Sequence, residues 1–451
     1  MIVVGLAAGC FIILAAGYGL ALLVLKDLLR INLIECGCLS WLFGVGIVSL
    51  LLWVCGIFSS GLALQGIVTA ICIGLGLIGW RTQQQARPRF ELPLPETWVE
   101  WALAIMIALE IATVTFVSFK HTLGWDGLLN WEIKARYAFF GNGVLPGNYY
   151  SSSGRGFSHP EYPLAIPFAE LWLYLWMGEP HQLFVKIIFP LFYAAGACLL
   201  VLFIARLTGK HWIGLMIGVL LPLVPFVTAG AGGAIVGYAD FPIGVVYLAA
   251  VGYLLQYVID ARSPWLHCFT VCLALLPWIK SDGIILWAIL AVIVCAVFIS
   301  KKQLGICALA LAPGLVIIGA WKLYLAMMHA VHPADFARPT FGLLRGHIDR
   351  IGAIMWILWA ETTDTSDWSL LWLLAAVAIC YLLVQRRLEY FILVIGVIAP
   401  IVLYSLTYIF SAWPSFTAHM TSSIPRLLFQ IVPVAWLAVG IAVALPKNRV
   451  E

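Results

Sequence analysis

One segment of the chain places an acid, an amide, bases and aromatic residues in an order that could do chemistry. Asp126 opens the segment within the sequence Gly124-Trp125-Asp126. Amide, aromatic and cationic side chains follow it: Asn130, Trp131, Lys134 and Arg136. An acid beside a long apolar run is costly unless it serves a site, so we predict that this segment carries the chemistry.

The spacing of these residues fits one face of a helix. If a helix begins at Asp126, then Asp126, Asn130 and Lys134 recur every fourth residue, so one face carries an acceptor, an amide and a cation. The alternatives are a row of surface ion pairs and a solvated carboxylate at a helix end. Both remain open from the sequence.

Further polar residues follow in the sequence His159-Pro160-Glu161-Tyr162-Pro163. His159 is a candidate ligand or general base, and its position between Gly156 and Pro160 also fits a simple turn residue. Glu161 and Tyr162 have the same two interpretations.

Three more polar groups fall where apolar runs begin or end. Asp240 precedes Pro242 and has a structural explanation as a helix N-cap. Ser281 or Asp282 could cap a helix too, but this leaves Lys280 unexplained. Arg426 opens the last apolar run and could snorkel to lipid headgroups. An Arg and a Lys at helix ends also suit a phosphate at the bilayer surface.

The amino-acid composition indicates whether these residues belong to a water-soluble protein or to a membrane protein. Hydrophobic residues make up 63% of the chain and charged residues 10%, with a mean hydropathy of +1.03. No water-soluble domain of this length has such a composition, so we predict an all-α polytopic membrane protein. The formal net charge of +4 favours no nucleic-acid partner. The 11 cysteines lie in or beside apolar runs, which argues against disulfides and a thiol-bound metal.

About 20 apolar residues cross a bilayer as a helix. This rule predicts thirteen spans, near residues 2–25, 37–58, 61–80, 98–119, 183–205, 211–229, 241–258, 264–279, 283–300, 304–328, 367–385, 390–409 and 425–445.

Charge sorting predicts the orientation. With Met1 outside, the inner links hold 14 of the 25 basic residues and the outer side holds 12 of the 21 acidic ones. The first apolar run has no basic residue ahead of it, so we expect a retained helix. We therefore expect an integral protein of the bacterial inner (cytoplasmic) membrane, with the site facing outward and the C-terminus in the cytoplasm.

Two long outer loops, 120–182 and 329–366, contrast with the short inner links. We predict two interfacial helices in the first loop, at 127–140 and 164–177, because aromatic residues recur there at helical spacing. The Gly-, Asn- and Ser-rich piece 141–156 is expected to be mobile and to close over a substrate. The Pro-containing link 81–95 divides three N-terminal helices, 1–97, from a core at 98–451.

The core resembles the polytopic GT-C glycosyltransferases, especially the bacterial relatives of protein mannosyltransferases and lipid A aminoarabinose transferases. The resemblance covers 98–445. It is carried by Gly124-Trp125-Asp126, Lys134-Ala135-Arg136, His159-Pro160-Glu161-Tyr162-Pro163, Tyr238-Ala239-Asp240, Lys280-Ser281-Asp282-Gly283 and Arg426. One departure is that Gly127 follows Asp126 where the protein mannosyltransferases have a paired Glu.

The resemblance implies transfer of a sugar from a polyprenyl-phosphate donor to a lipid, glycan or protein acceptor at the outer membrane face. Asp126 would be the general base, and Lys280 and Arg426 would bind the lipid phosphate. The other candidate substrate-binding residues are Asn130, Trp131, Lys134, Arg136, His159, Glu161, Tyr162, Asp240 and Asp282. No cofactor is required. A divalent metal is an unsupported alternative, for which the outer loops offer His159, His329, His332, Asp335 and His347.

Two other classes compete with this interpretation. A lipid-linked-glycan ligase or polymerase would use a similar outer loop without needing Asp126. A transporter or flippase usually places charges near the middle of the membrane. Glu110 is the one clear mid-span charge in the sequence, and a hydrogen bond between helices would explain it.

Overall fold

The computed structural model describes residues 1–451 except 87, 229, 231, 332–334 and 446–451. Among these residues, nine helical segments are long and apolar enough to cross a membrane. Seven are single helices: α1 (Ile2–Val24), α2 (Leu33–Gly56), α3 (Gly61–Ala86), α4 (Trp98–Lys120), α12 (Asp240–Asp260), α14 (Gly283–Ser300) and α15 (Leu304–Met327). The other two join short turns to long helices: α8 (Gln182–Val185) with α9 (Ile188–Thr208), and α20 (Leu388–Thr407) with η4 (Tyr408–Phe410).

A tenth candidate span is bent. Helices α21 (Phe416–Phe429) and α22 (Val432–Ala444) meet at an angle of 49°. Pro433, in the first turn of α22, has no N–H to continue the helical hydrogen bonds, which favours a break just before it. The break falls at Gln430 and Ile431, inside the predicted span 425–445.

The described residues thus contain nine or ten candidate spans where thirteen were predicted. The predicted spans 211–229, 264–279 and 367–385 contain shorter helices: α10 (His211–Leu220), α13 (Ser263–Ile279) and α19 (Leu371–Val384). In the first of these, Pro222 and Pro225 divide the segment into α10, η3 (Leu221–Leu223) and α11 (Pro225–Thr228). Hydropathy alone does not report such breaks.

The first long loop contains the two predicted helices. A π-helical turn, η1 (Gly127–Glu132), runs into α5 (Ile133–Phe140), and α7 (Ala165–Met177) follows later. Between them lie α6 (Gly147–Ser151) and η2 (Ser153–Ser158). Tyr149 and Tyr150 are buried there, and the Tyr150 carbonyl accepts a hydrogen bond from the Val331 N–H at 2.8 Å. The predicted mobility of this piece stays a prediction, as does the interfacial position of both helices.

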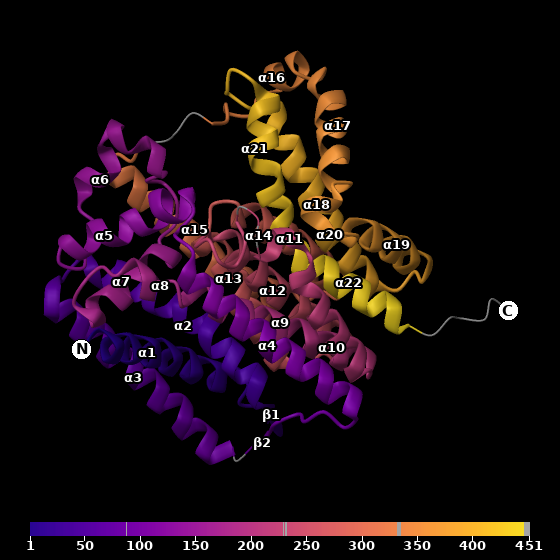
Figure 1. The fold of residues 1–451 in the computed structure, drawn as a ribbon, viewed down its shortest axis with the longest axis horizontal. Helices are drawn as coiled ribbons and strands as arrows, with labels where there is room; N and C mark the ends of the chain where they lie inside the picture. Colours follow the sequence, from indigo (N-terminus) through magenta and orange to yellow (C-terminus); the bar gives the residue numbers. More distant parts are fainter. Residues whose placement is uncertain (87, 229, 231, 332–334, 446–451) are drawn as a thin grey trace.

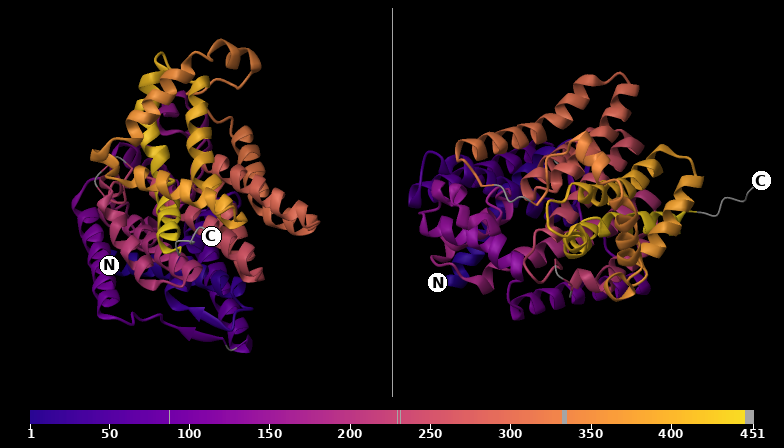
Figure 2. Two further views of the ribbon diagram at one scale, coloured as in Figure 1. Left: turned by 90° about the vertical axis from the view of Figure 1, so that its right-hand side faces the viewer. Right: turned by 90° about the horizontal axis from the view of Figure 1, so that it is seen from above.

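The second long loop contains α16 (Phe341–Gly346), α17 (Arg350–Thr362) and α18 (Thr365–Trp368). It is held against the chain before α21, because the Arg350 guanidinium donates to the carbonyls of Ile409 and Ser411 at 3.1 Å each. In Figure 1, α16, α17 and α21 lie at the top, and the left view of Figure 2 shows the same arrangement.

The opposite end of the molecule gathers links that the charge sorting placed on the inner side. Strands β1 (Arg30–Asn32) and β2 (Arg89–Glu91) pair in parallel there, at the bottom of Figure 1. Arg206 donates two hydrogen bonds to the Glu35 carboxylate nearby, the first at 2.8 Å. Segments predicted to share a side therefore meet in the fold. The basic residues Arg87, Lys447 and Arg449 lie outside the described residues.

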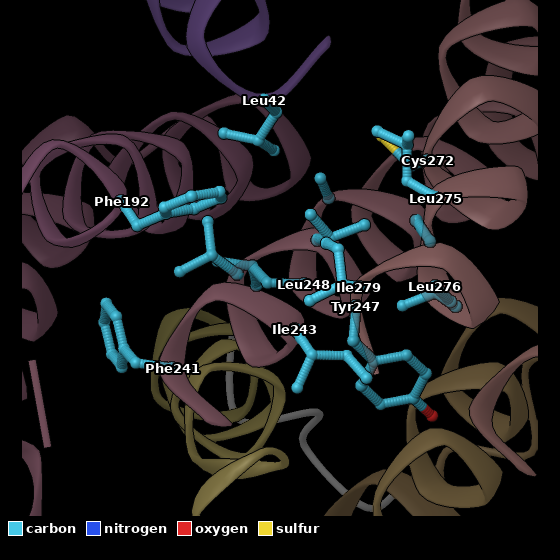
Figure 3. Close-up of a cluster of buried hydrophobic side chains, with 14 of the residues drawn as sticks. Leu42, Phe192, Phe241, Ile243, Tyr247, Leu248, Cys272, Leu275, Leu276 and Ile279 are labelled. Carbon is cyan, nitrogen blue, oxygen red and sulfur yellow. The ribbon is translucent and has the colours of Figure 1, made fainter. Parts of the chain in front are cut away.

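Figure 3 shows a cluster of buried hydrophobic side chains in the apolar core of the molecule. Helices α12 and α13 supply most of its labelled side chains, and α2 and α9 add Leu42 and Phe192. Phe241 and Ile279 in this core are the chain neighbours of Asp240 and Lys280. Their burial fixes the N-terminal end of α12 and the C-terminal end of α13 side by side. Helix α2 also packs against α7 and α9, and the predicted division at 81–95 stays a prediction.

Candidate functional site

Asp240 is the centre of a charged cluster at the ends of three helices. It is fully buried, and its Oδ1 accepts from Lys280 Nζ at 2.7 Å and from Gln430 Nε2 at 2.9 Å. Its Oδ2 accepts from Arg426 Nε and Nη2 at 3.2 Å each. Asp240 is the first residue of α12 and makes no capping bond, because the N-cap position belongs to Ala239. The N-cap explanation of Asp240 is therefore wrong.

Asp126 joins this cluster from the first long loop. Its Oδ2 lies 2.5 Å from Arg426 Nη2, so one guanidinium bridges two carboxylates. The Tyr238 ring lies under the same guanidinium, with 4.9 Å between Arg426 Cζ and the ring centroid. The side chains of Asp126 and Arg426 are 14% and 20% exposed, whereas Asp240 is sealed from solvent.

Two glycines allow the Asp126 turn to approach the chain before α12. The Gly124 N–H donates to the Val236 carbonyl at 2.8 Å. A Cβ at Gly124 would lie 2.6 Å from the Tyr238 ring, and a Cβ at Gly127 would lie 2.6 Å from the Val236 carbonyl oxygen. Gly127, which replaces the paired Glu expected from the resemblance, is thus required by this close packing.

Asp282 and Gln430 complete the cluster. Lys280 Nζ lies 2.7 Å from Asp282 Oδ2, and Gln430 Nε2 donates to the same oxygen at 3.2 Å. The Tyr404 hydroxyl donates to Gln430 Oε1 at 2.9 Å, which fixes the orientation of the amide. Asp282 occupies the N-cap position of α14, as one interpretation predicted, but its side chain makes no capping hydrogen bond and pairs with Lys280.

Gln430 was missed in the sequence. It is fully buried and lies at the break between α21 and α22, where its side chain leaves the helix toward the two carboxylates. The available signal was an amide inside an apolar run, two residues before the Val432-Pro433 pair at which a new helix begins.

Lys134 forms a second group beside this cluster. It is fully buried, and its Nζ donates to the Asn130 carbonyl at 2.8 Å. It lies over the rings of Trp131 and Tyr162, at 5.4 and 5.6 Å from their centroids. Burial lowers the pKa of Lys134 to about 7, although Glu161, Asp126 and Glu170 each favour its charged form.

The predicted face of Asp126, Asn130 and Lys134 needs a correction. The first turn is a π-helix, which rotates side chains differently from the α-helix that the spacing assumed. Asn130 contributes its backbone carbonyl to Lys134, not its amide. The three residues share a region without forming a hydrogen-bonded row of side chains.

Tyr162 lies beside both groups, and His159 and Glu161 contact each other next to it. His159 adopts a left-handed conformation, stacks on Tyr162 with 4.6 Å between ring centroids, and places Nδ1 3.1 Å from Glu161 Oε1. Tyr162 interacts electrostatically with Asp282, Arg426 and Asp126. The structure therefore brings this motif next to the charged cluster.

The side chains of Arg136 and Trp131 lie in different environments. Arg136 Nε lies 3.6 Å from Glu132 Oε1, one helical turn earlier, and the Arg136 side chain is 41% exposed. Trp131 is fully buried, so it packs under the loop and cannot stack on a substrate in this conformation. Among the described residues, neither side chain makes a hydrogen bond or ion pair with the side chains of Asp126, Asp240 or Arg426.

The predicted outer-loop metal candidates do not gather. Among the residues that the structure describes, no group of three or more His, Cys, Asp or Glu side chains could hold a metal ion. His347 Nδ1 lies 3.0 Å from the Ile409 carbonyl, in the loop packing described above. His332 lies outside the described residues.

The site combines a partly exposed carboxylate with two cationic side chains that are bound to a buried acid. Aromatic side chains lie beside these charged groups. A carboxylate can accept a proton, and Lys and Arg together can hold a phosphate. Comparison of the chain with protein-family models, curated proteins and solved structures finds no match. The structure establishes a polytopic, essentially all-helical membrane protein in which Asp126, Asp240, Lys280 and Arg426 converge.

Proposed function

We propose that the chain is a glycosyltransferase that moves a sugar from a polyprenyl-phosphate donor to an acceptor at the outer membrane face. The observation that carries this proposal is the convergence of Asp126, Asp240, Lys280 and Arg426 from four distant parts of the chain. A proton acceptor beside two cations matches a reaction that removes a proton and releases a phosphate.

In the proposed reaction the acceptor hydroxyl oxygen attacks the anomeric carbon of the sugar. Asp126 takes the hydroxyl proton as the new carbon–oxygen bond forms. The bond from the anomeric carbon to the phosphate oxygen breaks, and polyprenyl phosphate leaves with the bonding electrons. Lys280 and Arg426 stabilise the charge that develops on the phosphate. Asp240 holds both cations in position, and His159, Glu161 and Tyr162 face the sugar.

A groove beside the site suits the lipid chain of the donor. It has a volume of about 700 Å³ and is lined mainly by apolar residues of α4 and of the segment 222–236. Val236 lines it and also accepts the hydrogen bond from Gly124, two residues before Asp126. A prenyl chain in this groove would place its phosphate near the charged cluster.

The proposal includes the finer topology. If α10, α13 and α19 cross the membrane as short spans, they complete thirteen crossings with the long helices and the bent pair. The cluster then faces the outside of a bacterial inner membrane, and the C-terminus faces the cytoplasm. Cysteine accessibility at Glu179 and Arg262 in intact cells tests this orientation, because the two residues lie on opposite predicted sides.

Mass spectrometry of membrane glycolipids and glycoproteins tests the function. Membranes with and without the chain should differ by one sugar on a defined acceptor, and polyprenyl phosphate should be released in step with its transfer. Identical glycan profiles, together with intact donor, would reject the proposal. A ligase or polymerase of lipid-linked glycans would instead lengthen glycan chains and retain activity without Asp126.

One observation favours a second candidate, a transporter of a lipid-linked or small polar substrate. Glu110 lines the groove on α4, and its buried Oε2 has no hydrogen-bond partner among the described residues. The hydrogen bond between helices expected for Glu110 is therefore not found. A transporter would move substrate across vesicle membranes without releasing polyprenyl phosphate, which separates the two functions.

A further inference from the structure

We infer that Arg426 exchanges one of its two carboxylate partners for the phosphate of the donor, and that this exchange frees Asp126 to act as the base. The inference rests on the proposed function. It adds an order of events to the proposed reaction: the donor binds before Asp126 can accept a proton.

Two groups that the proposed reaction needs are bound to each other in the structure. Arg426 Nη2 lies 2.5 Å from Asp126 and 3.2 Å from Asp240. The Asp126 Oδ2 atom is therefore directed at the guanidinium and not at an acceptor hydroxyl. Arg426, in turn, directs its Nε and Nη2 atoms at carboxylates.

Charge balance shows why a partner must leave. Asp126, Asp240 and Asp282 face Lys280 and Arg426, so three carboxylates oppose two cations. A phosphate added to this cluster would meet like charges at short distance in a poorly solvated place. Binding becomes favourable when the phosphate replaces a carboxylate on the cation.

The geometry identifies Asp126 as the partner that leaves. Asp240 is fully buried and accepts from Lys280, Gln430 and Arg426, so removing it from the cluster would break every one of these bonds. Asp126 contacts Arg426 alone among the charged residues of the cluster and is 14% exposed. Asp282 is 24% exposed and holds Lys280, which makes it the corresponding exchangeable partner on the other cation.

The exchange has a direct consequence for the reaction. Before the donor binds, Arg426 holds Asp126 Oδ2, so this oxygen is not free to approach an acceptor hydroxyl. After binding, Arg426 holds the phosphate while Asp240 keeps the guanidinium in place. The freed carboxylate then faces the sugar that the same phosphate carries.

Binding of a soluble prenyl phosphate tests the exchange without any sugar transfer. Purified full-length protein in lipid nanodiscs is titrated with farnesyl monophosphate, with farnesol and inorganic phosphate as comparison ligands. Asp126→Asn removes the competing carboxylate at nearly constant size, so we expect farnesyl monophosphate to bind about tenfold more tightly than to wild type. Glu179→Gln removes an exposed acid of the same loop and should leave the affinity unchanged.

Two results would overturn the exchange. One is unchanged or weaker farnesyl phosphate binding by folded Asp126→Asn. The other is equal binding of inorganic phosphate and farnesyl phosphate, which would make the cluster a free-phosphate site. If Asp126→Asn fails to fold, a structure of the wild type with bound farnesyl phosphate decides: Arg426 must contact the phosphate and lie beyond ion-pair distance from Asp126.

The test separates this inference from the proposed function. Tighter binding by Asp126→Asn, combined with a wild type that transfers no sugar, supports the exchange and rejects glycosyl transfer. Sugar transfer by the wild type, combined with unchanged affinity in Asp126→Asn, supports the function and rejects the exchange.

Discussion

The Asp126 carboxylate and the Arg426 guanidinium lie 2.5 Å apart, which ties the first long loop to helix α21 of the bent pair. The contact joins two segments that are far apart in the sequence. It also means that the candidate base and the candidate phosphate ligand neutralise each other until something separates them.

Asp240→Asn should destabilise the protein strongly. The substitution removes a negative charge that is fully buried between Lys280 and Arg426, and breaking such a pair on one side costs roughly 3 kcal/mol or more. Denaturant unfolding in a fixed detergent measures the loss. Glu179→Gln, an exposed acid, is the control and should change the free energy of unfolding little. Equal stability of the two variants would mean that Asp240 does not hold the cations.

Gly127→Ala should remove sugar transfer while keeping most of the fold. The added Cβ would lie 2.6 Å from the Val236 carbonyl, so the turn carrying Asp126 must move away. We expect transfer to fall at least about tenfold and stability to fall by about 1–3 kcal/mol. Gly66→Ala in α3, whose Cβ meets nothing within 4 Å, is the matched control. Full transfer by Gly127→Ala would contradict the close approach.

Gln430→Met should lower the rate of transfer more than the apparent affinity for the acceptor. The Met side chain has similar size but cannot donate to Asp240 and Asp282 or accept from Tyr404. Loss of these buried bonds costs about 1–3 kcal/mol and loosens both carboxylates. Steady-state kinetics gives kcat and KM separately.

Gln256→Met provides the control for that variant. Gln256 is a buried glutamine of α12, about 24 Å along the helix from Asp240 at 1.5 Å per residue. Its replacement should leave both kinetic constants unchanged. An identical effect of the two substitutions would show that Gln430 has no particular role in positioning the carboxylates.

The sequence predicted the participants of the site better than their contacts. Asp126, Asp240, Lys280 and Arg426 stood out because charge at the ends of apolar runs is rare, and all four converge. Their pairing could not be read from spacing, since it depends on how helices α12, α13 and α21 pack. Gln430 was not predicted, because a single amide changes the mean hydropathy of an apolar run too little to stand out.

The helices, too, were predicted only in part from the sequence. Long apolar runs predicted α1, α4, α12 and α14 nearly to their ends. The π-helical turn at Gly127–Glu132 was not predicted, because the spacing of the polar residues was matched to an α-helix. The predicted span 211–229 is not one long helix, because Pro222 and Pro225 interrupt it while changing its mean hydropathy little.

Stability should rise with pH near neutrality through Lys134. Burial lowers its pKa from 10.5 to about 7 in the folded protein, so the unfolded chain binds the proton more tightly between these values. Lys134 therefore opposes folding most below pH 7, and this penalty is relieved as pH rises from 7 toward 10.5. Unfolding midpoints of wild type and Lys134→Met between pH 6.5 and about 9 isolate the effect. The wild type should gain stability relative to the variant across this range, and a constant difference would place the pKa of Lys134 elsewhere.

Sugar transfer by Asp126→Asn tests the central claim most directly. The amide keeps the size of the carboxylate but cannot take the acceptor proton, so transfer from a polyprenyl-phosphate donor should fall by a factor of about 10²–10⁴. Membrane insertion and the unfolding midpoint should stay close to those of the wild type. A folded Asp126→Asn protein that transfers sugar at the wild-type rate would contradict the assignment of Asp126 as the base.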